Sequence, residues 1–133
     1  MRALSSDRAV VAANDQFVSP TYVPDLVDAV LDLIIDGETG IWHIANQGRT
    51  SWAGFAAMLG ERAGLEIGRI DSRPTAELAL RAIRPLDVAL RSSRGALLPA
   101  LEDAVDRFAQ AWPSSLAPIV LEQDQGIDKS SSV

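Results

Sequence analysis

Polar side chains able to bind a ligand are concentrated between residues 16 and 22. They are Gln16, Ser19, Thr21 and Tyr22. The prolines in and after this stretch remove backbone donors and restrict backbone angles, so the loop should have a defined shape. Several polar tips on a stiff loop are typical of a binding site, but the same residue types also form turns in which they satisfy their own backbone. Spacing alone leaves both interpretations open.

A second group of candidate binding residues consists of arginines. Between residues 69 and 94 there are six arginines and three acidic residues, which gives a local charge of six minus three, or +3, in a chain of net charge −6. The arginines are Arg69, Arg73, Arg81, Arg84, Arg91 and Arg94. Because a guanidinium binds phosphate through two parallel hydrogen bonds, this surface suits a small anionic ligand. The alternative is that the arginines are scattered over a solvated loop.

The residues form no recognisable catalytic or metal-binding motif. The chain has no cysteine and a single histidine, His43, which excludes disulfides and sites built from thiolates or several histidines. His43 lies in an apolar run, where a hydrogen-bonded structural imidazole is expected rather than an acid or base. Asp28, Asp32 and Asp36 recur at every fourth position, but one helix edge cannot surround a cation, so we expect a solvated face. We assign no catalytic residue and no metal ligand.

Strands and helices alternate along the chain and position these residues. Apolar runs predict strands at residues 9–13 and 40–45. Amphipathic periods predict about three helices, at residues 25–36, 51–63 and 99–112. The less regular region between the last two helices is expected to hold a short strand at 67–70, a helical turn at 75–80 and an extended segment at 84–90. The expected fold class is therefore α/β, a small module of short strands and about three helices.

Details of two helices lead to specific expectations about packing. In the first helix, the apolar residues expected to share the buried face are Leu26, Val30, Leu33 and Ile34. Ser51 is a suitable N-cap for the second helix. Trp52 could stack on a nucleotide base, but its spacing from Phe55 favours packing in the core.

Three motifs in order resemble one known family. They are Asp-Gln-x-x-Ser-Pro-Thr-Tyr-x-x-Asp-Leu at 15–26, Gly-Ile-Trp-His-Ile-Ala followed by Ser-Trp-Ala-Gly-Phe-Ala between 40 and 56, and Ala-Ile-Arg-Pro at 82–85. Together they resemble the C-terminal, substrate-binding part of dTDP-4-dehydrorhamnose reductases, in the extended short-chain dehydrogenase/reductase superfamily. The resemblance covers roughly residues 8–112. It implies a nucleotide-sugar site using Gln16, Ser19, Thr21 and Arg84, with Arg84 at the diphosphate. Val18 and Val88 depart from the Gly and Ser usual in the family.

The resemblance also implies chemistry that this chain does not carry by itself. A complete family member uses NAD(P)H and a Tyr-x-x-x-Lys pair, whereas this chain has one tyrosine, Tyr22, one lysine, Lys129, and no Gly-x-Gly-x-x-Gly turn. We therefore expect no cofactor in this chain, an absent Rossmann half, and no reductase activity alone. The alternative is a non-catalytic interaction or structural module that associates with another chain. Expected partners are a nucleotide-sugar and the missing Rossmann half or another protein chain, with a homodimer as the alternative assembly.

Composition and charge limit the expected cellular location and the kinds of partner. No apolar run approaches the about eighteen residues of a membrane span, and no basic segment followed by an apolar one begins the chain, so we expect a cytoplasmic protein without membrane contact. A net charge of −6 and a pI near 4.6 argue against nucleic acid as a partner. We expect one substrate-binding-like module over residues 1–112 and a tail over 113–133 that is disordered toward its end.

Overall fold

Three helices and four short strands make up the part of the chain that the computed structural model describes, residues 9–112. The strands are β1 (Val10–Ala13), β2 (Phe17–Val18), β3 (Thr50–Ser51) and β4 (Ile70–Arg73). The helices are α1 (Val23–Ile35), α2 (Trp52–Arg62) and α3 (Leu101–Ala111), with short 3₁₀ turns η1 (Ile67–Arg69) and η2 (Thr75–Glu77). The predicted α/β class and the three predicted helices are confirmed. The predicted tail at 113–133 lies outside the described residues.

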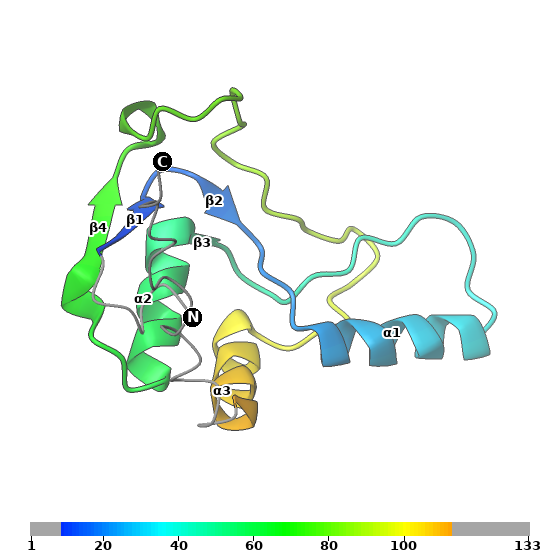
Figure 1. Ribbon diagram of the computed structural model, residues 1–133. Helices are drawn as coiled ribbons and strands as arrows, with labels where there is room; N and C mark the ends of the chain where they lie inside the picture. Colours follow the sequence, from blue (N-terminus) through cyan, green and yellow to red (C-terminus); the bar gives the residue numbers. More distant parts are fainter. Residues whose placement is uncertain (1–8, 113–133) are drawn as a thin grey trace, which may run out of the picture.

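Two small sheets organise the chain. Strand β1 pairs in parallel with β4, with Val10 opposite Ile70, and α2 packs against both strands (Figure 1). Strands β2 and β3 pair antiparallel, with Phe17 opposite Ser51. The strand predicted at 9–13 is confirmed, whereas residues 67–70 mostly form η1 and the strand follows at 70–73. Gly68 lies inside that turn and lacks the side chain with which a strand residue packs.

The hydrophobic core lies between α2 and α3. Its buried centre is Leu59, Leu101 and Val105, with Phe55, Met58 and Phe108 packed against it. Helix α3 places these residues on one face because they recur at the helical period. The prediction that the last helix closes the core is therefore confirmed.

The start of α2 follows the predicted cap. The Ser51 hydroxyl accepts a hydrogen bond from the Gly54 N–H at 3.0 Å, which satisfies one donor of the first turn. The helix ends at Arg62, and Gly64 then adopts a φ of +64°, in the left-handed region that favours glycine.

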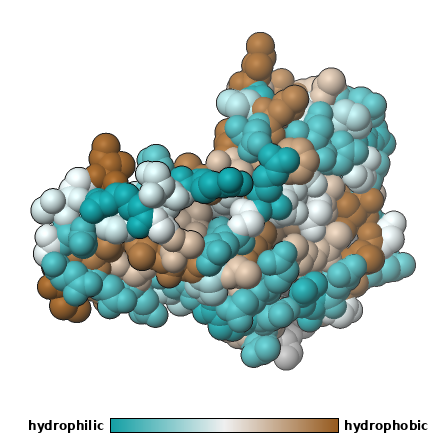
Figure 2. Space-filling view, turned by 180° about the vertical axis from the view of Figure 1, so that it is seen from behind, coloured by the Kyte–Doolittle hydropathy of each residue, from teal (hydrophilic) through white to brown (hydrophobic). Residues whose placement is uncertain are grey.

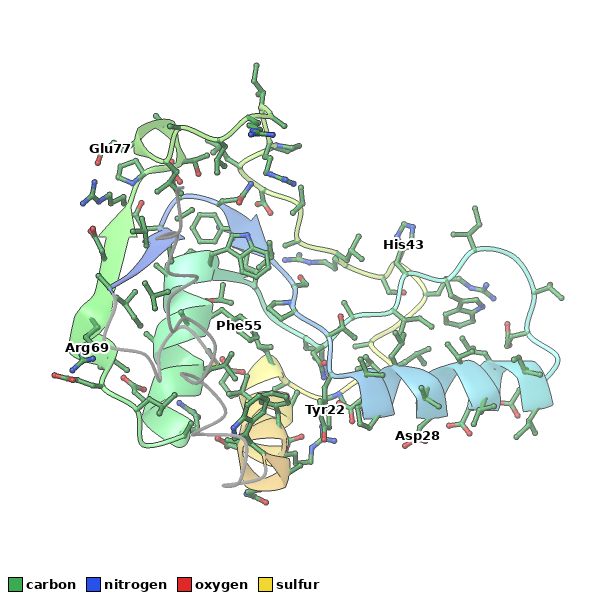
Figure 3. The ribbon with its side chains drawn as sticks, in the orientation of Figure 1. Tyr22, Asp28, His43, Phe55, Arg69 and Glu77 are labelled. Carbon is green, nitrogen blue, oxygen red and sulfur yellow. The ribbon has the colours of Figure 1, made fainter. Side chains whose placement is uncertain are left out.

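The strand predicted at residues 40–45 does not form. None of the backbone groups of residues 41–45 makes a hydrogen bond with another backbone group in the described range. A strand forms only when another strand pairs with it, and no other segment of residues 9–112 pairs with this one. His43 is accordingly exposed, with its ring pointing away from α1, instead of forming the structural hydrogen bond that we expected (Figure 3).

Helix α1 buries less of its apolar surface than its sequence predicts. Leu26 and Leu33 are half-buried, but Val30 is 39% exposed and Ile34 is 68% exposed. Figure 1 shows the reason: α1 projects away from the other elements, so they cover only part of its surface. Asp28, the labelled acidic residue of α1 in Figure 3, is exposed as predicted. None of the three helices within 9–112 is long and apolar enough to cross a bilayer.

Candidate functional site

A groove of about 650 Å³ runs beside β1 and the first turn of α2. It brings together Gln16 and Arg84, two of the four residues predicted to bind a ligand, although they are far apart in the sequence. We call it the Arg84 groove. The side chains that line it are mainly apolar and comprise Val10, Val11, Ala12, Ala13, Gln16, Val18, Trp52, Phe55, Ala56, Leu59, Leu78, Leu80, Arg84, Pro85 and Val88. A largely apolar wall with a few polar groups is the usual composition of a small-molecule site.

Arg84 is the cationic group of this groove. Its side chain is exposed, and it forms no ion pair or hydrogen bond with any other side chain of residues 9–112. By contrast, Arg73 Nη2 lies 2.5 Å from Asp71 Oδ2, and Arg94 Nη2 lies 2.8 Å from Glu38 Oε2. Pairing therefore divides the arginine-rich region into side chains held by carboxylates and side chains that keep all their donors available to an anion.

Gln16 holds the backbone beside Arg84. It is only 6% exposed, and its Nε2 donates a hydrogen bond to the Pro85 carbonyl at 3.3 Å. The adjacent Phe17 N–H donates to Leu86 O at 2.6 Å, and Phe17 O accepts from Val88 N at 3.0 Å. These bonds fix residues 85–88 as an extended segment alongside β2, in agreement with the extended segment predicted at 84–90. Gln16 thus positions the chain next to the guanidinium.

Ser19 and Thr21 lie outside the Arg84 groove. The Ser19 hydroxyl accepts a hydrogen bond from Leu90 N at 3.1 Å and donates to Gly48 O at 3.1 Å. Thr21 Oγ1 donates to Ser19 O at 3.3 Å. Both hydroxyls are therefore engaged with backbone groups. Thr21 bonds within the loop itself, as in the turn interpretation, whereas Ser19 ties the loop to the distant segments at Gly48 and Leu90.

Trp52 forms an aromatic wall of the Arg84 groove. The prediction that it packs in the core is wrong, because its side chain is 45% exposed while Phe55 turns toward the core. The two rings meet edge to face, with centroids 6.4 Å apart. Val18 and Val88, the departures from the family pattern, line the same groove. An exposed indole beside a free guanidinium offers stacking and phosphate binding within one hollow.

Sequence reasoning missed a buried polar network centred on Asn46. This side chain is 1% exposed; its Oδ1 accepts from Tyr22 N at 2.8 Å, and its Nδ2 donates to Asp25 Oδ2 and Pro99 O, each at 3.1 Å. Arg107 Nη2 donates to the same Asp25 oxygen at 2.7 Å. Because Asn46 directly follows the apolar run at 40–45, only that position hinted at a structural role. The network joins the loop that carries Ser19 and Thr21 to α1 and α3.

Electrostatics within the network follow from these contacts. The hydrogen bond from Arg107 is the main cause that lowers the pKa of Asp25; burial opposes it, and the Asn46 amide and the charge of Arg107 lower the pKa further. Asp25 is thus held as a carboxylate at the start of α1, where the helix dipole also favours negative charge.

An apolar cleft of about 460 Å³ lies between α2, α3 and the loop that leads into α1. Helices α2 and α3 line it with Phe55, Leu59, Leu101, Ala104, Val105, Phe108 and Trp112, and the loop contributes residues 20–23. In Figure 3 Tyr22 lies at the start of α1 and Phe55 on α2, and the Tyr22 ring meets Phe108 edge to face at 6.4 Å. The cleft has no charged lining residue, so the Arg84 groove is the better candidate for an anionic ligand. No three acidic or histidine side chains gather as a metal site within the described range.

Comparison with known proteins places the chain in a family. Residues 1–118 match the family model described as the RmlD substrate binding domain. The dTDP-4-dehydrorhamnose reductase of Mycolicibacterium smegmatis (strain ATCC 700084 / mc(2)155) is 36% identical over 114 residues, covering 78% of this chain and 35% of that protein. The spore coat polysaccharide biosynthesis protein SpsK of Bacillus subtilis (strain 168) is 42% identical over 72 residues, covering 54% of this chain and 25% of that protein.

The fold agrees with solved structures of the same reductases. The crystal structure of dTDP-4-dehydrorhamnose reductase from Bacillus anthracis str. Ames, in complex with NADP, superposes with a TM-score of 0.73 at 28% identity, covering 80% of this chain and 40% of that one. The reductase from Yersinia enterocolitica shares the fold, with a TM-score of 0.69. The chain thus spans well under half of the length of the relatives that it matches. The agreement of motifs, family match and fold means that this chain belongs to the RmlD substrate-binding domain family.

Proposed function

We propose that the chain binds a nucleotide-sugar of the dTDP-4-keto-deoxysugar type in the Arg84 groove. Arg84 would contact the diphosphate, and the base would stack against Trp52. One observation carries the proposal. The exposed guanidinium of Arg84 has no carboxylate partner among residues 9–112, and it lies in a groove that the exposed indole of Trp52 also lines. Gln16 and Ser19 support binding by holding the segment that follows Arg84 through Pro85 and Leu90, and Thr21 braces the Ser19 backbone from outside the groove. The family membership and the names of the relatives support this choice of ligand.

The chain's part in this function is binding, and reduction requires residues that it does not contain. In a complete reductase the hydride comes from NAD(P)H, and the present sequence has neither a Gly-x-Gly-x-x-Gly turn nor a Tyr-x-x-x-Lys pair. We therefore propose that this chain binds and orients the sugar nucleotide for a cofactor-binding half located elsewhere, in dTDP-rhamnose biosynthesis in the cytoplasm. The side chains of the Arg84 groove supply phosphate recognition and an apolar wall that excludes water from the bound ligand.

Calorimetry of the full chain with dTDP-glucose tests this site. Binding should be saturable and should weaken as salt rises from low to moderate concentration, because salt screens an exposed arginine–phosphate contact. Arg84→Ala should weaken binding by about 10- to 100-fold, since a hydrogen bond to a charged group contributes about 1.5–3 kcal/mol. Arg91→Ala, which removes another exposed arginine outside the groove, should change affinity by less than about twofold, as expected for a charge that does not touch the ligand.

The opposite results would refute the site. Absence of heat at millimolar ligand, from protein whose circular dichroism shows helix, would exclude autonomous binding. Equal losses in Arg84→Ala and Arg91→Ala would mean that general charge, rather than the Arg84 groove, attracts the ligand.

A second candidate function is favoured by a different observation. Helix α1 carries exposed valine, leucine and isoleucine side chains, and such surfaces mark interaction sites. A non-catalytic interaction module would bind no dTDP-sugar and would still associate with another polypeptide. The calorimetric titration distinguishes this alternative from the first.

A further inference from the structure

The loop after η2, residues 79–84, carries an uncovered aliphatic side chain. All six residues of the loop are exposed, and Ile83 is fully exposed. Leu80 and Leu86, on either side of Ile83 in the sequence, are 45% and 53% exposed. Figure 1 places this stretch at the top edge of the molecule, and Figure 2 shows hydrophobic side chains projecting at that edge. A fully exposed isoleucine adds nothing to the core, so it is available for contact outside the chain.

Three arginines in and after this loop have no carboxylate partner. Arg81, Arg84 and Arg91 are exposed, and they form no ion pair with any side chain that the structure describes. The one acidic residue in this part of the sequence, Asp87, pairs with Arg49. The loop region therefore presents positive charge that no neighbouring carboxylate offsets, although the whole chain has a net charge of −6.

The negative charge of the chain is concentrated on a different element. Asp25, Asp28 and Asp32 belong to α1, and Asp36 caps its C-terminal end. Figure 1 shows α1 projecting from the side of the molecule, away from the top edge where the loop lies. A negatively charged surface that approaches the loop therefore meets the unpaired arginines before it meets the aspartates, and salt screens the more distant charges.

Aliphatic and cationic side chains in one exposed loop fit the surface of an anionic membrane. An aliphatic side chain enters the boundary between headgroups and acyl chains, while arginines bind the lipid phosphates. Nucleic acid fits less well, because the loop region has no aromatic side chain on which a base could stack and because the net charge of the chain is negative. We propose that this loop docks the protein onto a membrane surface rich in anionic phospholipid, with Ile83 inserted and Arg81 and Arg91 at lipid phosphates.

This docking goes beyond the proposed nucleotide-sugar binding and uses other side chains. Arg81, Ile83 and Arg91 do not line the Arg84 groove, whereas Arg84 does. Contact through a loop also needs no membrane-spanning segment. It therefore differs from the sequence-based expectation of a protein without membrane contact, which considered only spanning and leader segments.

Vesicle sedimentation tests the docking. The full chain is mixed at low salt with sucrose-loaded vesicles of phosphatidylglycerol, and separately with vesicles of phosphatidylcholine. It should sediment with the first and not with the second, and the bound fraction should fall as salt rises. Arg81→Gln combined with Arg91→Gln should weaken binding by roughly 25-fold, since each arginine near an anionic surface contributes about fivefold.

A matched pair of isoleucine variants separates insertion from charge. Ile83→Asp should weaken vesicle binding by at least about tenfold, because it removes the inserted side chain and adds a negative charge. Ile35→Asp makes the same change in net charge at an isoleucine of α1 that is 79% exposed, and it should change binding by less than about twofold. Equal losses in the two variants would overturn the proposal.

The absence of cysteine permits a direct measurement of insertion. Ile83→Cys provides a single thiol for an NBD fluorophore, whose emission should increase and shift to shorter wavelength on phosphatidylglycerol vesicles as the probe leaves water. The same label on Ile35→Cys should change little. Unchanged emission of the label on Ile83→Cys, under conditions in which the protein sediments, would contradict the assignment of this loop as the docking surface.

Further arms distinguish other ligands. No sedimentation with phosphatidylglycerol, from protein whose circular dichroism shows helix, would overturn the docking. Release from the vesicles by millimolar inorganic phosphate at constant ionic strength would show that the arginines bind the phosphate group alone, and preferential binding of poly(U) RNA would assign the surface to nucleic acid; either result would also overturn it. Calorimetry keeps the two proposals apart, since the variants of Arg81, Ile83 and Arg91 should retain dTDP-glucose binding.

Discussion

At the scale of single residues, the polar side chains of this protein divide into those that hold the backbone and those that are free for a ligand. Ser19 and Thr21 give their hydroxyls to backbone groups, whereas Arg84 keeps its donors free among the described residues. The charge pattern identified an arginine-rich region, but it could not separate Arg84 from Arg94, because Arg94 pairs with Glu38, a carboxylate far away in the sequence that only the folded chain brings close. Which arginine is available to an anionic ligand therefore depends on the ion pairs that the folded chain forms.

Relative to its size, Asn46 is the side chain whose removal should destabilise the fold most. Asn46→Ala leaves the Tyr22 N–H and the Pro99 carbonyl without their buried partner, so we expect the free energy of unfolding to fall by about 2–3 kcal/mol. Urea unfolding followed by circular dichroism measures this change. Asn14→Ala, at an exposed asparagine, should stay within about 0.5 kcal/mol of wild type. Equal stabilities of the two variants would show that the Asn46 network does not support the fold.

At the scale of elements, the ion pair between Asp25 and Arg107 joins α1 to the core helix α3. The pKa of Asp25 in the folded protein lies below its unfolded value, so its contribution to stability is present above pH of about 4 and is lost as the pH falls through the folded pKa. Asp15 acts in the same direction, because hydrogen bonds from Thr75 lower its pKa.

We predict that removing the Asp25–Arg107 pair makes the free energy of unfolding less sensitive to acid. In urea titrations from pH 6 to pH 2, the slope of unfolding free energy against pH should be shallower in Asp25→Asn than in wild type. At neutral pH the variant should lose about 1–2 kcal/mol, since Arg107 is 37% exposed and solvent screens part of the interaction. Asp28→Asn, at an exposed carboxylate of the same helix, should retain the wild-type slope. A wild-type slope in Asp25→Asn would rule out this contribution.

Helices could be predicted from the sequence better than strands, for a physical reason. The period of Leu101, Ala104 and Val105 predicts both α3 and its buried face, because the backbone bonds of a helix lie within the helix. Residues 40–45 have strand-forming types, yet no other described segment pairs with them. Trp52 likewise has a core spacing but faces the Arg84 groove, because neighbouring elements decide which face is covered. Of the four predicted site residues, Gln16 and Arg84 meet in one groove, and the motifs that carried the resemblance had already pointed to both.

At the scale of the whole molecule, the proposed binding groove and the exposed apolar face of α1 lie in separate parts of the chain. The Arg84 groove is built on β1 and α2, whereas α1 projects away from both of them (Figure 1). A nucleotide-sugar and a protein partner therefore contact different residues, and each can be removed by substitution without removing the other.

The three tryptophans allow one spectrum to report on each of these surfaces. Trp52 lines the Arg84 groove, Trp112 lines the apolar cleft and Trp42 lies in the segment that follows α1. In a ¹H–¹⁵N titration of the full chain with dTDP-glucose, with indole signals assigned by single substitutions, we expect a saturable shift of the Trp52 signal, little change in the other two, and loss of the shift in Arg84→Ala. A shift of Trp112 or Trp42 with Trp52 unmoved, or a Trp52 shift that persists in Arg84→Ala, would contradict the assignment of the Arg84 groove as the nucleotide-sugar site.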